Sequence, residues 1–232
     1  MNQSRAANSL LAVLPHKGYR LLLPRLESVT LKFGDVIYRP RKAIQHVYFP
    51  IDCMVSLLTL VEGHRALEVG LVGREGMLGI PLALGVRDSP VRALVQGSGT
   101  ALRMKSAHFL NEFGYNLPLR RAVFRYTYDR MVQVTQTAAC NRFHHIDARL
   151  ARWLLMTRDR VCSNQFRITQ DMLGGMLGVL RVAVTKAAGT LQKRKLISYG
   201  RGEISILDGK ALEAAACPCY QIVKAVPALT RA

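Results

Sequence analysis

The segment from Thr169 to Ile206 constrains the fold more than any other part of this chain. Its pattern predicts two helices joined by a tight turn and followed by a short hairpin. Thr169 suits the N-cap of the first helix, because its hydroxyl can accept a hydrogen bond from an orphan backbone N–H. Gly178 falls at the turn, where a positive φ costs glycine little. The segment therefore predicts a winged helix-turn-helix.

The second helix of this segment has two unlike sides. Its apolar side is expected to be buried and carries Val184, Ala187, Ala188 and Leu191. Arg181, on the opposite side, could bind guanine O6 and N7 with two hydrogen bonds. We therefore expect this helix to enter the major groove of double-stranded DNA, with Arg201 of the hairpin on a phosphate. The expected DNA-contacting residues are Thr169, Gln170, Leu180, Arg181, Val182, Thr185, Lys186 and Arg201.

The charge balance agrees with a polyanionic partner. The chain of 232 residues has 33 Lys and Arg against 15 Asp and Glu, a formal net charge of +18. Such an excess favours nucleic acids, although charge alone does not separate DNA, RNA and acidic membranes, or exclude a generally basic protein. No run is long and apolar enough to span a bilayer, and no signal-peptide pattern is evident, so we expect a cytoplasmic protein with no membrane partner.

Short β-prone runs punctuated by glycine dominate the first half of the chain. They follow an expected helical lead-in, Ser9–Pro24. Many short strands at this spacing indicate a β-sandwich or barrel. The expected strands are Val29–Phe33, Asp35–Tyr38, His46–Phe49, Met54–Leu60, Leu67–Val72, Arg92–Gln96 and Thr100–Met104.

A long helix is expected to begin at Pro118, since proline is favoured in a first helical turn. Its apolar residues form two stripes, which suit packing on its own domain and on a twin helix of a second subunit; a single wide core face is the alternative. The expected homodimer contacts are Leu119, Val123, Tyr126, Met131 and Val134. A second helix, Ile146–Val161, is expected to expose Arg149, Arg152, Arg158 and Arg160.

These elements predict an α+β protein with four parts. Residues 1–117 are expected to form a β-rich domain, which the family resemblance described below implies is a sensor, and residues 118–140 the dimerisation helix and hinge. Residues 141–220 form the winged helix-turn-helix domain, and residues 221–232 a flexible tail.

Three further motifs extend the argument to the whole chain: Phe33–Tyr38, Val47–Pro50 and the glycine-rich Gly70–Gly79. Together with the winged helix, they resemble the Crp/Fnr family of bacterial transcription regulators. The resemblance implies an N-terminal cyclic-nucleotide-binding-like β-roll (a double-stranded β-helix, or jelly roll), a long dimer helix and a C-terminal DNA-binding domain. The resemblance does not indicate whether the protein is an activator or a repressor, since activation depends on surface contacts with RNA polymerase.

The expected effector site departs from the family pattern. Nucleotide-binding members place Glu in the glycine-rich cassette and Arg on a later strand, whereas this chain has Met77 and Val91 there. Arg92 comes one residue late, and a shift of one residue on a strand turns a side chain to the other face. We therefore expect cyclic AMP recognition to be lost, and Val182 in place of a family Glu to change the operator. The effector-pocket candidates are Met77, Leu78, Gly79, Val91, Arg92, Ala93 and Tyr126.

No cofactor or metal is predicted. The cysteines are Cys53, Cys140, Cys162, Cys217 and Cys219, and are expected to be free thiols. Cys217-Pro218-Cys219 lacks a second pair of ligands, which argues against zinc and leaves a thiol redox role open. The acidic residues Asp35, Asp52, Glu62, Glu68 and Glu75 lack catalytic spacing and are expected to be solvated, so an enzyme is not predicted. The alternative function is a metabolite- or nucleotide-sensing module whose winged helix contacts protein or RNA.

Overall fold

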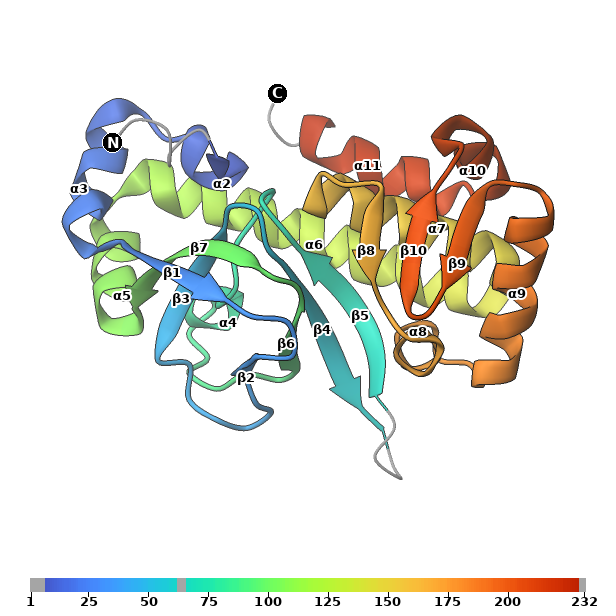
Figure 1. Ribbon diagram of the computed structural model, residues 1–232. Coiled ribbons are helices and arrows are strands. Elements are labelled where there is room, and N and C mark those ends of the chain that lie inside the picture. Colours follow the sequence, from blue (N-terminus) through green and yellow to red (C-terminus); the bar gives the residue numbers. More distant parts are fainter. Residues whose placement is uncertain (1–6, 62–65, 230–232) are drawn as a thin grey trace.

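The computed structural model describes residues 7–61 and 66–229 (Figure 1). A long helix, α6 (Leu117–Phe143), runs along the molecule and joins two parts. The β-roll packs on its first half, and the winged helix-turn-helix lies near its end, as Figure 1 shows. This order confirms the expected α+β architecture.

The N-terminal lead-in is broken into short helices. The expected helical lead-in over Ser9–Pro24 is present as α2 (Ser9–Ala12), α3 (His16–Leu22) and the 3₁₀ turn η1 (Leu23–Arg25). Pro15 separates the first two helices with extended backbone (φ −56°, ψ 153°). Proline fixes φ and has no N–H to continue a helix, which explains the break.

The β-roll consists of two antiparallel sheets. One has the order β1-β7-β3, with β1 (Glu27–Leu31), β7 (Gly99–Lys105) and β3 (His46–Pro50). The other has the order β2-β6-β4-β5, with β2 (Val36–Tyr38), β6 (Arg92–Gly97), β4 (Met54–Leu60) and β5 (Ala66–Val72). Each expected strand is present within two residues of its expected ends. Helices α4 (Ile80–Ala83) and α5 (Ser106–Tyr115) lie outside the sequence expectation.

Helix α6 buries one face, and that face changes character along its length. Asn116 caps its first turn by accepting a hydrogen bond from the backbone N–H of Leu119 (3.2 Å). Arg130 donates to the carbonyl oxygen of Leu71 (2.5 Å) on β5. The buried positions are Leu119, Val123, Tyr126, Arg130, Gln133, Thr137 and Cys140. Their spacing of three and four residues is that of one helical face, apolar first and polar afterwards.

Three of the expected dimer contacts on α6 are therefore misplaced. Leu119, Val123 and Tyr126 lie in the core of their own β-roll, because that domain already covers this face. Met131 and Val134 are 63% and 43% exposed and remain available to a partner.

Helix α7 has its expected bounds, Ile146–Val161, but not its expected exposure. Arg149 and Arg152 are only 7% and 4% exposed, so placing them in solvent is wrong. The cause is that α7 is covered on several sides, by β4, β5, α8, α9, α10 and α11. Arg160 is also largely shielded and forms an ion pair with Glu75 (Nε to Oε1, 2.9 Å).

The winged helix-turn-helix comprises β8 (Gln165–Arg167), α8 (Gln170–Leu177), α9 (Arg181–Lys193), β9 (Ile197–Gly200) and β10 (Glu203–Ile206). Its sheet has the order β8-β10-β9. Strand β8 is an addition to the sequence expectation. In the described part of the chain no single helix is long and apolar enough to cross a bilayer; only α8 and α9 taken together meet that criterion, and they are sharply bent.

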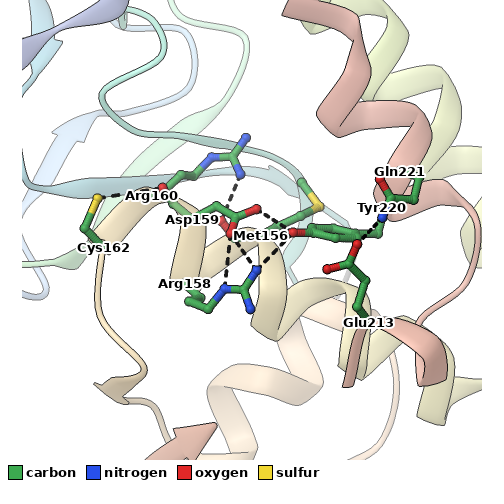
Figure 2. Close-up of polar contacts among 8 residues, drawn as sticks. All are labelled: Met156, Arg158, Asp159, Arg160, Cys162, Glu213, Tyr220 and Gln221. Carbon is green, nitrogen blue, oxygen red and sulfur yellow. Dashed lines mark hydrogen bonds and ion pairs between the residues drawn. The ribbon is translucent and has the colours of Figure 1, made fainter. Parts of the chain in front are cut away.

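The chain ends in helices α10 (Gly209–Ala215) and α11 (Cys219–Leu229). Residues 221–229, expected to form a flexible tail, belong to helix α11, and residues 230–232 lie outside the described part. Figure 2 shows how the start of α11 is attached to α7: the Tyr220 hydroxyl donates to Asp159 Oδ2 (2.8 Å) and accepts from Arg158 Nη2 (3.2 Å). Tyr220 is also buried, which explains why the helix stays on the protein.

Candidate nucleic-acid interface

The turn between α8 and α9 depends on two glycines. The two helices bend by 104°, within the range of helix-turn-helix motifs. Gly178 ends α8 with φ +63°, a left-handed conformation that favours glycine. A Cβ on Gly174 would lie 2.9 Å from the carbonyl oxygen of Val179, so only glycine lets the turn approach this closely. Gly178 has the role that the sequence predicts.

Helix α9 has one buried and one exposed side. Val184, Ala187, Ala188 and Leu191 are fully buried, as expected. The exposed side carries Leu180, Arg181, Val182, Thr185 and Lys186. The helix thus offers charged, polar and small apolar groups to a partner while its other side is held in the core.

Arg181 points outward at the first turn of α9. Its side chain is 65% exposed, and Nη1 lies 3.6 Å from Asp171 Oδ2. An exposed ion pair of this kind contributes about 0–1 kcal/mol, so a stronger partner can displace it. The guanidinium is therefore free to reach a base edge.

Hydrogen bonds fix the start of α8 and link it to α9. Thr169 Oγ1 accepts from the backbone N–H of Met172 (3.2 Å), which confirms its N-cap role. Thr185 Oγ1 donates to Gln170 Oε1 (2.7 Å) across the two helices. Thr185 and Gln170 are thus positioned together beside Arg181.

The hairpin between β9 and β10 forms the wing. Arg201 and Gly202 are consecutive residues with positive φ (+51° and +79°), the signature of a tight type I′ turn. Arg201 is exposed at its tip. Arg167 on β8 pairs with Glu203 on β10 at 2.9 Å and supports the wing from the side.

Further positive charge surrounds this surface. Besides Arg181, Lys186 and Arg201, the exposed basic residues are Arg167, Lys193, Arg194 and Lys195. Cationic side chains around a protruding helix suit the phosphates on either side of a DNA groove.

The expected effector positions are mostly filled by protein. Met77, Leu78, Ala93 and Tyr126 belong to one buried core cluster, and Gly79 is buried beside them. A Cβ on Gly76 would lie 2.0 Å from the Tyr126 ring, so this ring packs directly on the glycine-rich cassette.

Val91 and Arg92 lie at the start of β6 and are half-buried. Arg92 pairs in register with Leu58 of β4, and its Nε has no hydrogen-bond partner among the described residues. The strand therefore brings Arg92 to the edge of the buried cluster rather than into it.

A cleft of about 820 Å³ is lined by residues of both the β-roll and the winged helix-turn-helix domain. Sequence reasoning did not identify it, because its walls come from distant segments such as Met54, Trp153 and Phe166. Two nearly buried polar side chains line it, Gln96 and Thr157, and neither the Gln96 amide nor the Thr157 hydroxyl has a hydrogen-bond partner in the described structure.

Glu68 of β5 links the two domains and is buried, so its expected exposure is wrong. Its carboxylate accepts from Ser56 Oγ (2.6 Å) and from Trp153 Nε1 of α7 (2.9 Å). Burial raises the pKa of Glu68 to about 7, against the opposing effect of these hydrogen bonds. Glu75 is also not freely solvated, since it pairs with Arg160, and Glu62 lies outside the described residues.

Four possible metal ligands converge at the other end of α6. The ligand atoms of Cys140, His144, Cys217 and Cys219 all lie within 4.8 Å of one another. The second pair that Cys217-Pro218-Cys219 lacks in sequence is thus supplied in space by the end of the long helix.

Comparison with known proteins agrees with this geometry. Residues 148–215 match the family described as the Crp-like helix-turn-helix domain. FixK2 from Bradyrhizobium japonicum is similar in fold (TM-score 0.70, 14% identity, 83% of this chain and 98% of that chain). So are two proteins from Thermus thermophilus. One is a CRP-family transcriptional regulator (TM-score 0.69, 18% identity, 81% and 96% covered). The other is a CRP/FNR-family regulator (TM-score 0.63, 23% identity, 82% and 98% covered). No functionally curated protein matches the sequence.

Proposed function

We propose that this chain, which has the Crp/Fnr fold and carries a Crp-like helix-turn-helix domain, is a dimeric, sequence-specific DNA-binding transcription regulator. The observation that carries the proposal is the two-sided recognition helix α9. Its apolar side is fully buried, and its outer side presents Arg181, Val182 and Lys186 within a basic surface. The two Thermus thermophilus proteins of similar fold are named as transcriptional regulators, which supports a regulatory function.

In this proposal α9 enters the major groove. Arg181 reads a guanine, Val182 contacts a thymine methyl group, and Arg201 of the wing binds a phosphate. Thr169, Gln170, Leu180, Thr185 and Lys186 complete the contact surface around them. Two subunits would bind half-sites about 34 Å apart, one turn of DNA.

The outer face of α6 supports the dimer. Phe124, Tyr128, Met131 and Val134 are 48%, 57%, 63% and 43% exposed and recur at helical spacing. A solvent-facing stripe of large apolar side chains on a long helix is suited to a second copy of that helix.

The sensor domain is expected not to use cyclic AMP in the way of the nucleotide-binding family members. Met77 occupies the position of the family Glu and is buried among core residues, so no carboxylate is offered to a ribose hydroxyl there. Any effector would have to bind the DNA-competent and incompetent states with different affinities. A saturable affinity for cyclic AMP in the micromolar range would contradict this part of the proposal.

The decisive experiment is selection of binding sites from random DNA duplexes, with and without a cell metabolite extract. We expect a two-fold symmetric site whose affinity falls steeply with salt. A gel-shift comparison of the selected duplex with RNA of the same sequence tests the nature of the partner. Equal binding to RNA, or no enriched sequence under either condition, would overturn the proposal.

A further inference from the structure

We propose that Cys140, His144, Cys217 and Cys219 form a structural zinc site that joins the end of α6 to the start of α11. This site is separate from the DNA-contacting surface. It does not depend on the proposed function, because it concerns how the C-terminal helices are held.

The distances suit a tetrahedral ion. Cys140 Sγ lies 3.4 Å from Cys217 Sγ, and Cys219 Sγ lies 3.4 Å from His144 Nδ1. Zinc bonds of about 2.3 Å to sulfur and 2.0–2.1 Å to nitrogen place neighbouring ligands of a tetrahedron about 3.6–3.8 Å apart. All four ligand atoms already lie within 4.8 Å of one another, so small side-chain adjustments complete the geometry.

Local structure explains why the four residues meet. Cys140 and His144 are one helical turn apart, and the N–H of His144 donates to the carbonyl of Cys140 (3.1 Å) where α6 ends. Cys217 lies in the short connection between α10 and α11, and Cys219, after Pro218, is the first residue of α11. Both pairs are therefore held on short, restrained segments, as in zinc sites built from two ligand pairs.

The surroundings are those of a closed site. Cys140, Cys217 and Cys219 are 0%, 4% and 1% exposed. Gln136 Nε2 donates to Cys219 Sγ (3.0 Å), an outer hydrogen bond of the kind that orients metal ligands. A disulfide between Cys140 and Cys217 would need only two of these groups. Convergence of Cys219 and His144 on the same point favours a metal.

Two buried arginine side chains near the site would be stabilised by a negative charge. Arg149 and Arg152 are 7% and 4% exposed, and neither forms an ion pair with a carboxylate in the described residues. Arg149 Nη2 donates to Oδ1 of Asn141, the residue after Cys140 (2.9 Å), and Arg152 Nη1 donates to Oγ1 of Thr137, one helical turn before Cys140 (3.4 Å). Zn²⁺ bound by three thiolates and a neutral imidazole has a net charge of −1, which would partly balance them.

The zinc site would hold the end of α6 and the start of α11 together, next to the turn between α6 and α7. On one side it holds the end of α6, where the chain turns into α7. On the other it holds Cys219, next to Tyr220, whose hydroxyl is bound to α7 (Figure 2). Because the ligands converge only in the folded protein, zinc binding would add to its stability.

The test is metal analysis of the full chain purified under reducing conditions. We expect about one zinc ion per chain by inductively coupled plasma mass spectrometry. Replacement by Co²⁺ should give thiolate-to-cobalt charge-transfer bands and the visible bands of tetrahedral cobalt. Cys219→Ser and His144→Ala should weaken metal binding at least tenfold and change those bands. The matched controls Cys162→Ser, exposed, and Cys53→Ser, buried in the β-roll, should leave them unchanged.

Two outcomes would overturn the proposal. One is reduced wild-type protein that takes up neither zinc nor cobalt in a stoichiometric amount, a result that needs no variant to fold. The other is a cobalt spectrum that Cys219→Ser leaves unaltered. A Cys140–Cys217 disulfide found in protein that binds no metal after reduction would assign the cluster to thiol redox chemistry instead.

Discussion

The indole Nε1 of Trp153 donates a hydrogen bond to Oε1 of Glu68 (2.9 Å), which ties strand β5 of the β-roll to helix α7 of the C-terminal domain. Ser56 holds the other carboxylate oxygen at 2.6 Å. Around this contact the two domains share one core, in which Met54 and Leu58 of the β-roll pack with the winged helix. Ionisation of Glu68 therefore acts directly on the interface between the β-roll and the winged helix-turn-helix domain.

Stability should fall as this carboxyl ionises. The pKa of Glu68 is raised from 4.5 to about 7 in the folded chain, chiefly by burial, with Arg152 and Arg160 of α7 opposing the rise. Between these two pH values the folded state holds a proton that the unfolded state has lost, so stability decreases as pH rises through this window and is level above it. In wild type the free energy of unfolding should fall by up to roughly 3 kcal/mol across this window, and Glu68→Gln should abolish that decrease.

Urea unfolding of wild type and Glu68→Gln between about pH 5 and pH 8 measures this effect. Asp88→Asn, at an exposed carboxylate of the β-roll, is the control and should retain the wild-type slope. If the free energy of unfolding depended on pH equally in wild type and Glu68→Gln, the Glu68 carboxyl would not control the interface.

Arg181→Ala should weaken specific DNA binding by about 1–3 kcal/mol and relax preference at one base pair of each half-site. The reason is that Arg181 is the exposed guanidinium at the first turn of α9, where it makes a surface contact with Asp171. Gel shifts on the selected site and on single-base variants measure both effects. Arg20→Ala removes the same charge from an exposed position in α3 and should bind almost as wild type. Equal losses in the two variants would mean that only net charge matters.

Gly178→Ala should destabilise the protein by about 1–2 kcal/mol, because an L-residue is strained at positive φ. The new Cβ would also lie 2.7 Å from Leu67 Cδ1 of β5. Gly189→Ala is the matched control: it lies inside α9 with open space around it and should stabilise by roughly 0.5–1 kcal/mol. Urea unfolding of both variants measures whether the free energy of unfolding falls or rises. A stabilising effect of Gly178→Ala would refute the turn geometry.

Sequence reasoning succeeded where structure is decided locally. Thr169 marks the start of α8 because its side-chain oxygen accepts a hydrogen bond from a free backbone N–H. Gly178 marks the end of α8 because a residue without Cβ adopts positive φ with little strain. The bounds of α7 and the presence of each β-roll strand also follow from short patterns. These features require no knowledge of what packs against them.

It failed where burial depends on distant segments. Arg149, Arg152 and Glu68 were expected to be solvated because charged side chains usually stay in water, yet elements distant in the sequence cover them. The apolar stripe of α6 likewise shows that Leu119 will be buried, but not whether its own β-roll or a twin subunit does so. The Cys140–Cys217 approach joins residues 77 positions apart, and no local spacing reveals it.

Met131→Glu should dissociate the proposed dimer. Met131 is the most exposed member of the stripe with Phe124, Tyr128 and Val134, and it faces away from the β-roll core. In a two-fold interface built on this stripe, the same patch of both subunits meets, so a new carboxylate is placed near its own copy. Removal of a buried methionine costs roughly 1.5–3 kcal/mol per subunit, and the repulsion between like charges adds to it.

Sedimentation velocity over a range of protein concentrations measures the association directly. We expect wild type to sediment as a dimer and Met131→Glu as a folded monomer with circular dichroism unchanged. DNA binding should then fall by at least tenfold, since a monomer engages only one half-site. Tyr115→Glu places the same charge at the end of α5, where the side chain is 87% exposed, and should remain dimeric. A Met131→Glu dimer of wild-type strength would move the interface to another face of the molecule.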